Sequence, residues 1–225
     1  IWKIPPGGAP EQWIQHEMLT GLGLPDVPMP FPVGANGLAY VDNTIYAAVT
    51  EKAHVLRIPV GADGSAGEPE VVAGDEELAV LDGIALDENG DIYALVISQS
   101  KLVRIDADDG SITTLATAEE GLDFPASLAF GTQPVDNQAV YVTNFAIGPP
   151  GGAGPGVVKV DVGVPGLPLP YGTPPVAAAA VEEAAPEVVP ETGGAGIPLS
   201  AAVIVLGGAV VAGGLSVELL RRQTR

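Results

Sequence analysis

Short apolar runs alternate with Gly, Asp and Asn turn residues from Ile1 to about Pro170. The same order of apolar and polar positions recurs three times, with a period of roughly 45 residues. The three stretches are NGLAYVDNTIYAAV from Asn36, DGIALDENGDIYALV from Asp82, and ASLAFGTQPVDNQAVYVTN from Ala126. Apolar runs this short, bounded by turn residues, are typical of β-strands rather than of helices. We therefore predict an all-β domain built from a repeated unit.

Each repeat predicts several short strands in a fixed order. An apolar strand comes first, then a polar turn, a β-rich run that holds a tyrosine, and a strand with one basic residue. The apolar first strands are 38–40, 84–86 and 128–130. The tyrosines are Tyr46, Tyr93 and Tyr141, and the strands with a basic residue are 56–58, 103–105 and 158–160. The first two repeats predict a fourth strand, at Glu70–Ala73 and Ile112–Ala116, and Trp2–Ile4 and Gln12–Gln15 match the last two strands of an earlier repeat. Four short strands per period of this length are typical of a propeller blade.

The predicted fold class is all-β: a partial, six-bladed type of β-propeller, with about three blades plus two strands in this chain. The expected propeller region is 1–170, with blades near 1–35, 36–81, 82–125 and 126–165. The other blades would lie upstream in the same gene product or come from another chain, and we favour the first source. A generic antiparallel sandwich is the alternative fold.

Two segments of different composition follow the repeats. Residues 171–196 form a Pro/Ala/Glu-rich stretch, which predicts an extended, semi-rigid linker. The run from Ile197 to Val217 carries no charge. A helix needs about 20 apolar residues to cross the hydrocarbon of a bilayer, so we predict a transmembrane α-helix over 197–220 and a basic tail over 221–225. The alternative is a buried helix in the core of a soluble domain.

Small residues recur four apart in the predicted membrane helix. The pairs are Gly208 with Ala212, and Ala209 with Gly213. Such pairs let helix backbones approach closely in lipid. We therefore expect other membrane proteins as partners, contacting this chain through the helix and the linker, in addition to the lipid bilayer itself.

Charge predicts orientation and excludes one class of partner. The chain has 9 basic and 28 acidic residues, a net charge of −19, which disfavours nucleic acid because phosphate backbones would be repelled. Arg221, Arg222 and Arg225 lie just beyond the apolar run, and basic residues stay on the cytoplasmic side. We expect a single-pass protein of the cell membrane, with the propeller outside and the C-terminus in the cytoplasm. The chain has no cysteine, which excludes disulfides and thiolate catalysis.

One motif precedes the apolar run. Val189-Pro190-Glu191-Thr192-Gly193, followed by an apolar span and arginines, resembles a sortase sorting signal, although that signal usually begins with Leu. Two outcomes stay open, cleavage and wall anchoring or a simple membrane anchor. We favour the simple anchor.

The repeats resemble a known family. The sequences GANGLAY from Gly34, VLRIPVGADGSAG from Val55, LDGIALDENGDIYALV from Leu81 and LDFPASLAFG from Leu122 are similar to the gluconolactonase/regucalcin-like propellers, the senescence-marker-protein family. The resemblance covers about three quarters of the chain and corresponds to the C-terminal half of such a propeller. It implies a six-bladed fold that hosts hydrolases, binding proteins and scaffolds alike.

The resemblance also implies a metal site. A divalent cation, often calcium, lies on the propeller axis in this family, and its ligands include the Asn of an NG motif and the Asp of a DG motif. These residues correspond to Asn36 and Asp82, and Asp82 would also act as the base on a water. The third repeat departs from the pattern, with Ser127 where Gly is expected, and the acidic ligand of the family's first blade has no counterpart. Asn-Gly and Asp-Gly are also ordinary turn dipeptides, so blade geometry alone is the alternative explanation.

Other polar residues suggest structural roles. The run Asp87–Asp91 predicts a tight hairpin turn rather than a calcium loop, because the bidentate Glu of such a loop is missing. His16 and His54 are expected at the surface or at a strand edge, and two isolated histidines do not support a Ser-His-Asp triad.

Two functions follow from the sequence. The favoured one is a membrane-anchored, extracytoplasmic recognition or scaffold module, an accessory subunit of a larger membrane complex. The alternative is a divalent-metal-dependent lactone or ester hydrolase of the gluconolactonase type. Binding of a sugar or of peptidoglycan without catalysis is a third, less favoured option, and whether the protein is an enzyme stays open.

Overall fold

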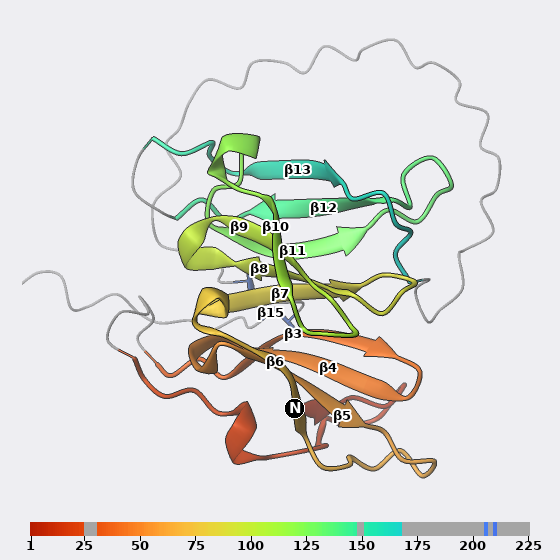
Figure 1. Ribbon diagram of the computed structural model, residues 1–225. Coiled ribbons are helices and arrows are strands. Elements are labelled where there is room, and N and C mark those ends of the chain that lie inside the picture. The colour runs from red at the N-terminus through yellow and green to blue at the C-terminus, as the bar shows by residue number, and fades with distance from the viewer. Residues whose placement is uncertain (25–30, 148–150, 168–204, 207–208, 211–225) are drawn as a thin grey trace, which may run out of the picture. The chain divides into compact units, whose positions relative to one another are not determined.

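The computed structural model describes residues 1–24, 31–147, 151–167, 205–206 and 209–210 (Figure 1). The chain divides into two compact units, Ile1–Gly172 and Thr173–Arg225. The first unit is all-β, with several antiparallel sheets. Its 3₁₀ helices are η1 (Glu17–Leu19), η2 (Thr50–Lys52), η3 (Glu76–Leu78), η4 (Ile97–Gln99) and η5 (Ala118–Glu120).

Two four-stranded sheets form the centre of the first unit, each with its strands in chain order. The first sheet contains β3 (Ala35–Val41), β4 (Thr44–Val49), β5 (His54–Pro59) and β6 (Glu70–Gly74). The second contains β7 (Leu81–Leu86), β8 (Ile92–Val96), β9 (Lys101–Ile105) and β10 (Ile112–Ala116). The strand predictions for the first two repeats are therefore confirmed.

The third repeat forms a three-stranded sheet of the same order. It contains β11 (Pro125–Phe130), β12 (Ala139–Asn144) and β13 (Gly156–Asp161). A two-stranded sheet precedes the repeats, with β1 (Trp2–Lys3) paired to β2 (Glu11–Gln12). This pairing corrects the outer strand predicted at Gln12–Gln15, because the observed strand is Glu11–Gln12. After it ends, the backbone N–H groups of Trp13 and Ile14 both donate to the carbonyl oxygen of Ile1.

Tight turns between the strands follow from local sequence. Asp42 and Asn43 close the β3–β4 hairpin with φ values of 45° and 56°, as a two-residue turn of this kind requires. In the β7–β8 hairpin, the Asp87 carboxylate accepts hydrogen bonds from the backbone N–H groups of Asn89 and Asp91, and the Tyr93 hydroxyl donates to it. The tight turn predicted at Asp87–Asp91 is confirmed.

Hydrophobic clusters join consecutive sheets. Along β8, Ile92 and Ala94 pack in a cluster with β5 and β6 of the first sheet, while Tyr93 and Leu95 pack in a cluster with β11 and β12 of the third. A strand buried on both faces is apolar throughout rather than alternating, as β8 is. The other face of the first sheet is covered by the N-terminal segment, including Trp13 and Leu19. Three sheets stacked in series are consistent with part of a propeller.

The first strands of the three sheets lie side by side and begin at the same end of the domain. The backbone near Gly37 on β3 touches Asp82 on β7, and the backbone near Gly83 touches Ser127 on β11. Figure 1 shows the sheets stacked in chain order, with the starts of β3, β7 and β11 on the left of the view. Residues at these three starts are therefore brought close together from positions far apart in the sequence.

Most of the C-terminal predictions fall outside the described residues. These include the linker 171–196, the sorting-like motif Val189–Gly193 and most of the expected membrane helix, with Gly208, Ala212 and Gly213. Four residues of that expected helix are described, and they pair as the short strands β14 (Val205–Leu206) and β15 (Ala209–Val210). In the described part of the chain, no helix combines the length and apolar character that a membrane crossing needs. The transmembrane anchor stays a prediction.

Candidate cation and catalytic site

Each first strand has an irregular pairing at the position that the sequence singled out. The register of β3 against β4 shifts between Ala35 and Leu38, around Asn36. The register of β7 against β8 shifts between Leu81 and Ile84, around Asp82. Such bulges change the direction of a side chain next to a strand, and they are frequent beside active sites. The two predicted ligands therefore occupy equivalent bulges on neighbouring strands.

The glycines of the NG and DG motifs have a structural role. A Cβ on Gly37 would lie 2.1 Å from the carbonyl oxygen of Asp82, and a Cβ on Gly83 would lie 2.9 Å from the Cα of Ser127. Contacts this short are forbidden, so neighbouring sheets can approach only where the residue has no side chain. Blade geometry therefore explains the Gly of each motif. It does not explain the Asn and the Asp that precede them.

Asp82 is a buried carboxyl without a partner. The residue is 3% exposed, and its Oδ1 has no hydrogen-bond partner among the described residues. Burial raises the pKa of Asp82 from its ordinary value of 3.8 to about 7. Most buried polar atoms in folded proteins are satisfied, so an orphan oxygen calls for a ligand that the protein alone does not supply.

Thr50 links the Asn36 side chain to the backbone just before Asp82, and the sequence analysis missed it. The residue is 3% exposed and directly follows β4. Its Oγ1 accepts a hydrogen bond from Asn36 Nδ2 at 3.3 Å and donates one to the carbonyl oxygen of Leu81 at 2.7 Å. A comparison of the repeats could have singled out this residue. The equivalent residues after β8 and β12 are the apolar Ile97 and Phe145, whereas Thr50 is polar.

Glu51 fixes the chain that leads into β3. The residue is 6% exposed, and its carboxylate accepts hydrogen bonds from the backbone N–H groups of Val33, at 2.8 Å, and of Leu22 and Gly23. These bonds, that from Val33 first, hold the pKa of Glu51 below its ordinary value. Because Glu51 follows Thr50, the loop before β3 is held beside the candidate ligands.

The donor set fits a hard divalent cation in part. The Asn36 side chain uses its nitrogen as donor to Thr50, which leaves its amide oxygen available, and Asp82 has an unpaired carboxyl oxygen. Calcium takes 6–8 oxygen ligands. Within the described residues, no group of three His, Cys, Asp or Glu side chains could hold a metal. The further ligands would have to be water, substrate or groups other than these side chains.

Replacing Thr50 tests whether its hydrogen bonds to Asn36 and Leu81 position the candidate ligands. We expect Thr50→Val to weaken cation binding by about 10- to 100-fold, as loss of a group that orients a metal ligand commonly does. Thr50→Ser keeps the hydroxyl and should bind as the unchanged protein does. Isothermal titration with Ca²⁺ and Mn²⁺ measures both affinities. Equal weakening in the Val and Ser variants would mean that Thr50 acts through packing and not through its hydrogen bonds.

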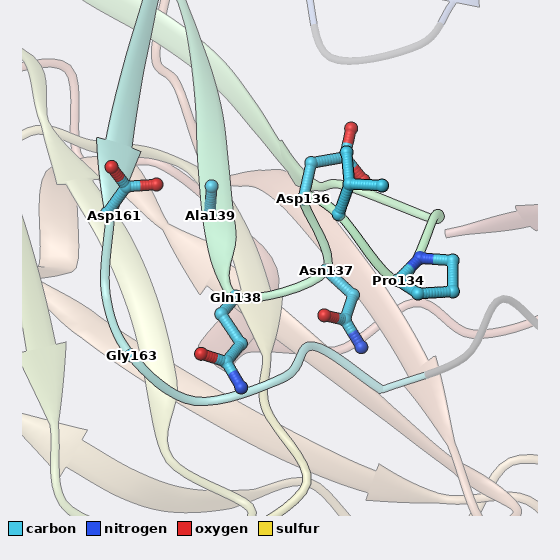
Figure 2. Close-up of a pocket in the computed structure, with 8 residues that line it drawn as sticks. Pro134, Asp136, Asn137, Gln138, Ala139, Asp161 and Gly163 are labelled. Carbon is cyan, nitrogen blue, oxygen red and sulfur yellow. The ribbon is translucent and has the colours of Figure 1, made fainter.

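Other polar features lie away from these residues. His16 accepts a hydrogen bond from Met18 N and lies 3.2 Å from Glu68. His54 is half-buried at the start of β5, between β4 and β6, rather than on an edge strand. Figure 2 shows a shallow hollow at the other end of the third sheet, where β12 begins and β13 ends. It is lined by Pro134–Ala139, Asp161 and Gly163, and includes neither Asn36 nor Asp82.

Stacked antiparallel sheets with oxygen donors at the starts of their first strands define a propeller-like protein with a candidate cation site. Residues 33–146 match the SMP-30/Gluconolactonase/LRE-like region, and the chain belongs to this family. A comparison with curated proteins finds no match.

Several solved structures are similar to the chain. A luciferin-regenerating enzyme matches with 21% identity and a TM-score of 0.50, over 61% of this chain and 48% of that one. Regucalcin from Agrobacterium tumefaciens, a calcium-binding protein, matches with 18% identity and a TM-score of 0.47, over 60% and 47%. A gluconolactonase from Xanthomonas campestris matches with 16% identity and a TM-score of 0.42, over 74% and 44%. This chain therefore spans about half the length of the structures it matches, and likeness at this level of identity concerns the fold alone.

Proposed function

We propose that this chain is part of a divalent-cation-dependent hydrolase of lactones or esters. The observation that carries the proposal is the unpaired, buried carboxyl of Asp82 at the bulged start of β7. Thr50 links the Asn36 side chain, at the equivalent bulge of β3, to the backbone carbonyl of Leu81, the residue before Asp82. Family membership supports the same function, because gluconolactonase is one of the activities for which the family is named. Calcium is a cation of the class that these oxygen donors favour.

Asn36 and Asp82 would hold the cation through oxygen. Thr50 would keep the Asn36 amide and the backbone before Asp82 in place. A bound divalent cation would polarise the carbonyl of the substrate. Asp82 has two carboxyl oxygens and takes a proton from the attacking water. The water oxygen bonds to the carbonyl carbon, the ring C–O bond breaks, and the ring oxygen takes up a proton, so one lactone and one water give one hydroxy acid.

The order of the two functions expected from the sequence is reversed in this proposal. A recognition or scaffold module requires no unpaired carboxyl in its interior, and nothing in the described residues favours that role over hydrolysis. A buried carboxyl with a raised pKa is, in contrast, a common feature of catalytic sites.

We also propose a location and partners, on the sequence alone. The charge-free run Ile197–Val217 would anchor the protein in a membrane, with the basic tail in the cytoplasm and the sheets outside. Other membrane proteins would contact the helix and the linker.

Removing divalent cations tests the proposed function. We expect the purified full-length protein to hydrolyse neutral lactones, measured by acid release with a pH indicator, and to lose at least about 100-fold of its turnover in EDTA. Adding back Ca²⁺ or Mn²⁺ should restore it, with Mg²⁺ compared in parallel. Lactone turnover that persists undiminished after chelation and dialysis would contradict a cation-dependent mechanism.

A further inference from the structure

Large apolar side chains are exposed on loops at the end of the domain that holds Asp82. Two groups lie on either side of the start of β7, one in the chain before β3 and one after β12. We call them the apolar rim, and its members are Leu22, Leu24 and Phe31, exposed by 58, 42 and 47%, and Phe145 and Ile147, exposed by 39 and 54%. Exposed apolar patches on soluble domains commonly mark binding sites.

The rim is held by backbone hydrogen bonds. Glu51, next to Thr50, binds the backbone N–H groups of Leu22 and Val33 on either side of the loop before β3. On the other side, Phe145 N donates to the carbonyl oxygen of Phe124, which lies just before β11. The backbone at both places is therefore anchored beside the starts of the first strands, which begin on the left of Figure 1. Anchored backbone keeps apolar side chains exposed where they would otherwise collapse.

Charge at the same end disfavours anionic substrates. The loops that carry η3 and η5 present five exposed acidic residues: Asp75, Glu76, Glu77, Glu119 and Glu120. Two basic residues lie at this end, Lys52 in η2, which donates a hydrogen bond to the carbonyl oxygen of Glu17, and Lys101 at the start of β9. A sugar acid or a phosphate approaching this end would meet a net negative potential, whereas a neutral molecule would not.

We propose that the substrate is a neutral lactone or ester with an aliphatic or aromatic substituent, which contacts the apolar rim while its carbonyl faces Asp82. This inference rests on the proposed hydrolase function. It assigns substrate preference to the rim and chemistry to Asp82. One additional methylene in an apolar pocket commonly changes kcat/KM by 10-fold or more, so an alkyl chain that contacts the rim should increase kcat/KM by at least about tenfold.

The test compares lactones of one ring size with the full-length protein. We expect kcat/KM for δ-dodecalactone, which carries an alkyl chain, to exceed that for unsubstituted δ-valerolactone by about tenfold or more, and to exceed that for glucono-δ-lactone further. Phe31→Ser and Phe145→Ser should each lower the ratio of the first two values several-fold. Val135→Ser is the matched control, because Val135 is 87% exposed and lies on the β11–β12 loop at the opposite end. Equal kcat/KM for the two lactones, or ratios that the Phe variants leave unchanged, would overturn the inference.

A binding measurement separates the two proposals. The six-membered cyclic amides with and without the same alkyl chain are poor substrates, and their affinities can be measured by titration calorimetry. The rim predicts that the alkyl amide binds at least about tenfold more tightly, and that Phe31→Ser and Phe145→Ser remove this difference. Binding that meets this expectation without turnover of any lactone would refute the hydrolase and leave the rim as an apolar binding site. Equal affinity of the two amides, together with lactone turnover that requires Asp82, would refute the rim alone.

Discussion

Asp82→Asn is expected to abolish lactone turnover and, in the absence of cation, to make the protein more stable at pH 8. The lost activity should be at least about 100-fold, because Asn cannot accept the proton from water and is a weaker cation ligand. The gain in stability follows from the burial of Asp82 without a hydrogen-bond partner for Oδ1. An unpaired buried charge destabilises the folded state, and Asn removes the charge while keeping the shape.

The sign of the pH dependence follows from the raised pKa. Burial lifts the pKa of Asp82 from 3.8 to about 7, so between these values the folded state binds more protons than the unfolded state. The contribution of Asp82 to the free energy of unfolding therefore falls as pH rises through this window. Above pH 7 it is lower than below pH 4 by an amount on the order of 4 kcal/mol. Asn has an unpaired amide of its own, so we expect it to recover about 2 kcal/mol at pH 8. Below about pH 4, where Asp82 is protonated in both the folded and the unfolded state, the order should reverse, with Asp82→Asn about 2 kcal/mol less stable than the unchanged protein.

Urea denaturation in EDTA at several pH values measures this effect, and Asp87→Asn is the matched control. Asp87 is also fully buried, but it accepts hydrogen bonds from Asn89 N, Asp91 N and the Tyr93 hydroxyl. Its replacement should therefore destabilise the protein under conditions in which Asp82→Asn stabilises it. Saturating Ca²⁺ should reverse the order for Asp82, because a ligand that binds only the folded state stabilises the protein that can bind it. Destabilisation by Asp82→Asn in EDTA at pH 8 would mean that Asp82 makes a favourable interaction in the folded protein.

Gly37→Ala is expected to lower the free energy of unfolding by about 3 kcal/mol or more and to abolish cation binding. The new Cβ would lie 2.1 Å from the Asp82 carbonyl oxygen, 3.0 Å from its carbonyl carbon and 3.0 Å from the Gly83 Cα. All three atoms belong to the backbone, so no side chain can turn aside to make room. The first and second sheets would have to separate, which moves Asn36 away from Asp82.

Ser127→Ala is the control for this substitution. Ser127 occupies the equivalent position in the third repeat and is exposed, so its change should alter stability by no more than about 0.5 kcal/mol. Urea denaturation gives both values, and titration with Ca²⁺ reports on the site. Gly37→Ala protein with an unchanged denaturation midpoint and unchanged affinity for Ca²⁺ would show that the two sheets are not held at this spacing in solution.

Sequence patterns predicted the strands well because each repeat carries its own hydrophobic alternation and turn chemistry. The strand predicted at 84–86, which forms the second half of β7, and the hairpin at Asp87–Asp91 are local features, set by residues next to one another. The positions of Asn36 and Asp82 could be predicted for the same reason, since each follows from its place within a repeat.

The contacts between repeats could not be predicted in this way. Thr50 acts across the boundary between two sheets, and its hydrogen bond to the Leu81 carbonyl joins residues 31 positions apart. The orphan oxygen of Asp82 depends on what surrounds it in space, which periodicity does not describe. The apolar rim was missed for a related reason. An exposed Phe and a buried Phe look alike in sequence, and only the hydrogen bonds that anchor the backbone, from Val33 to Glu51 and from Phe145 to the Phe124 carbonyl, distinguish them.

The contact between Gly37 and the Asp82 carbonyl also has a mechanical consequence. The side chain of Asp82 would bind a cation, and its main chain forms part of the contact between the first and second sheets. Cation binding and the rigidity of this contact are therefore coupled. A bound cation would restrict movement of one sheet relative to the other, and a weakened contact would lower the affinity for the cation.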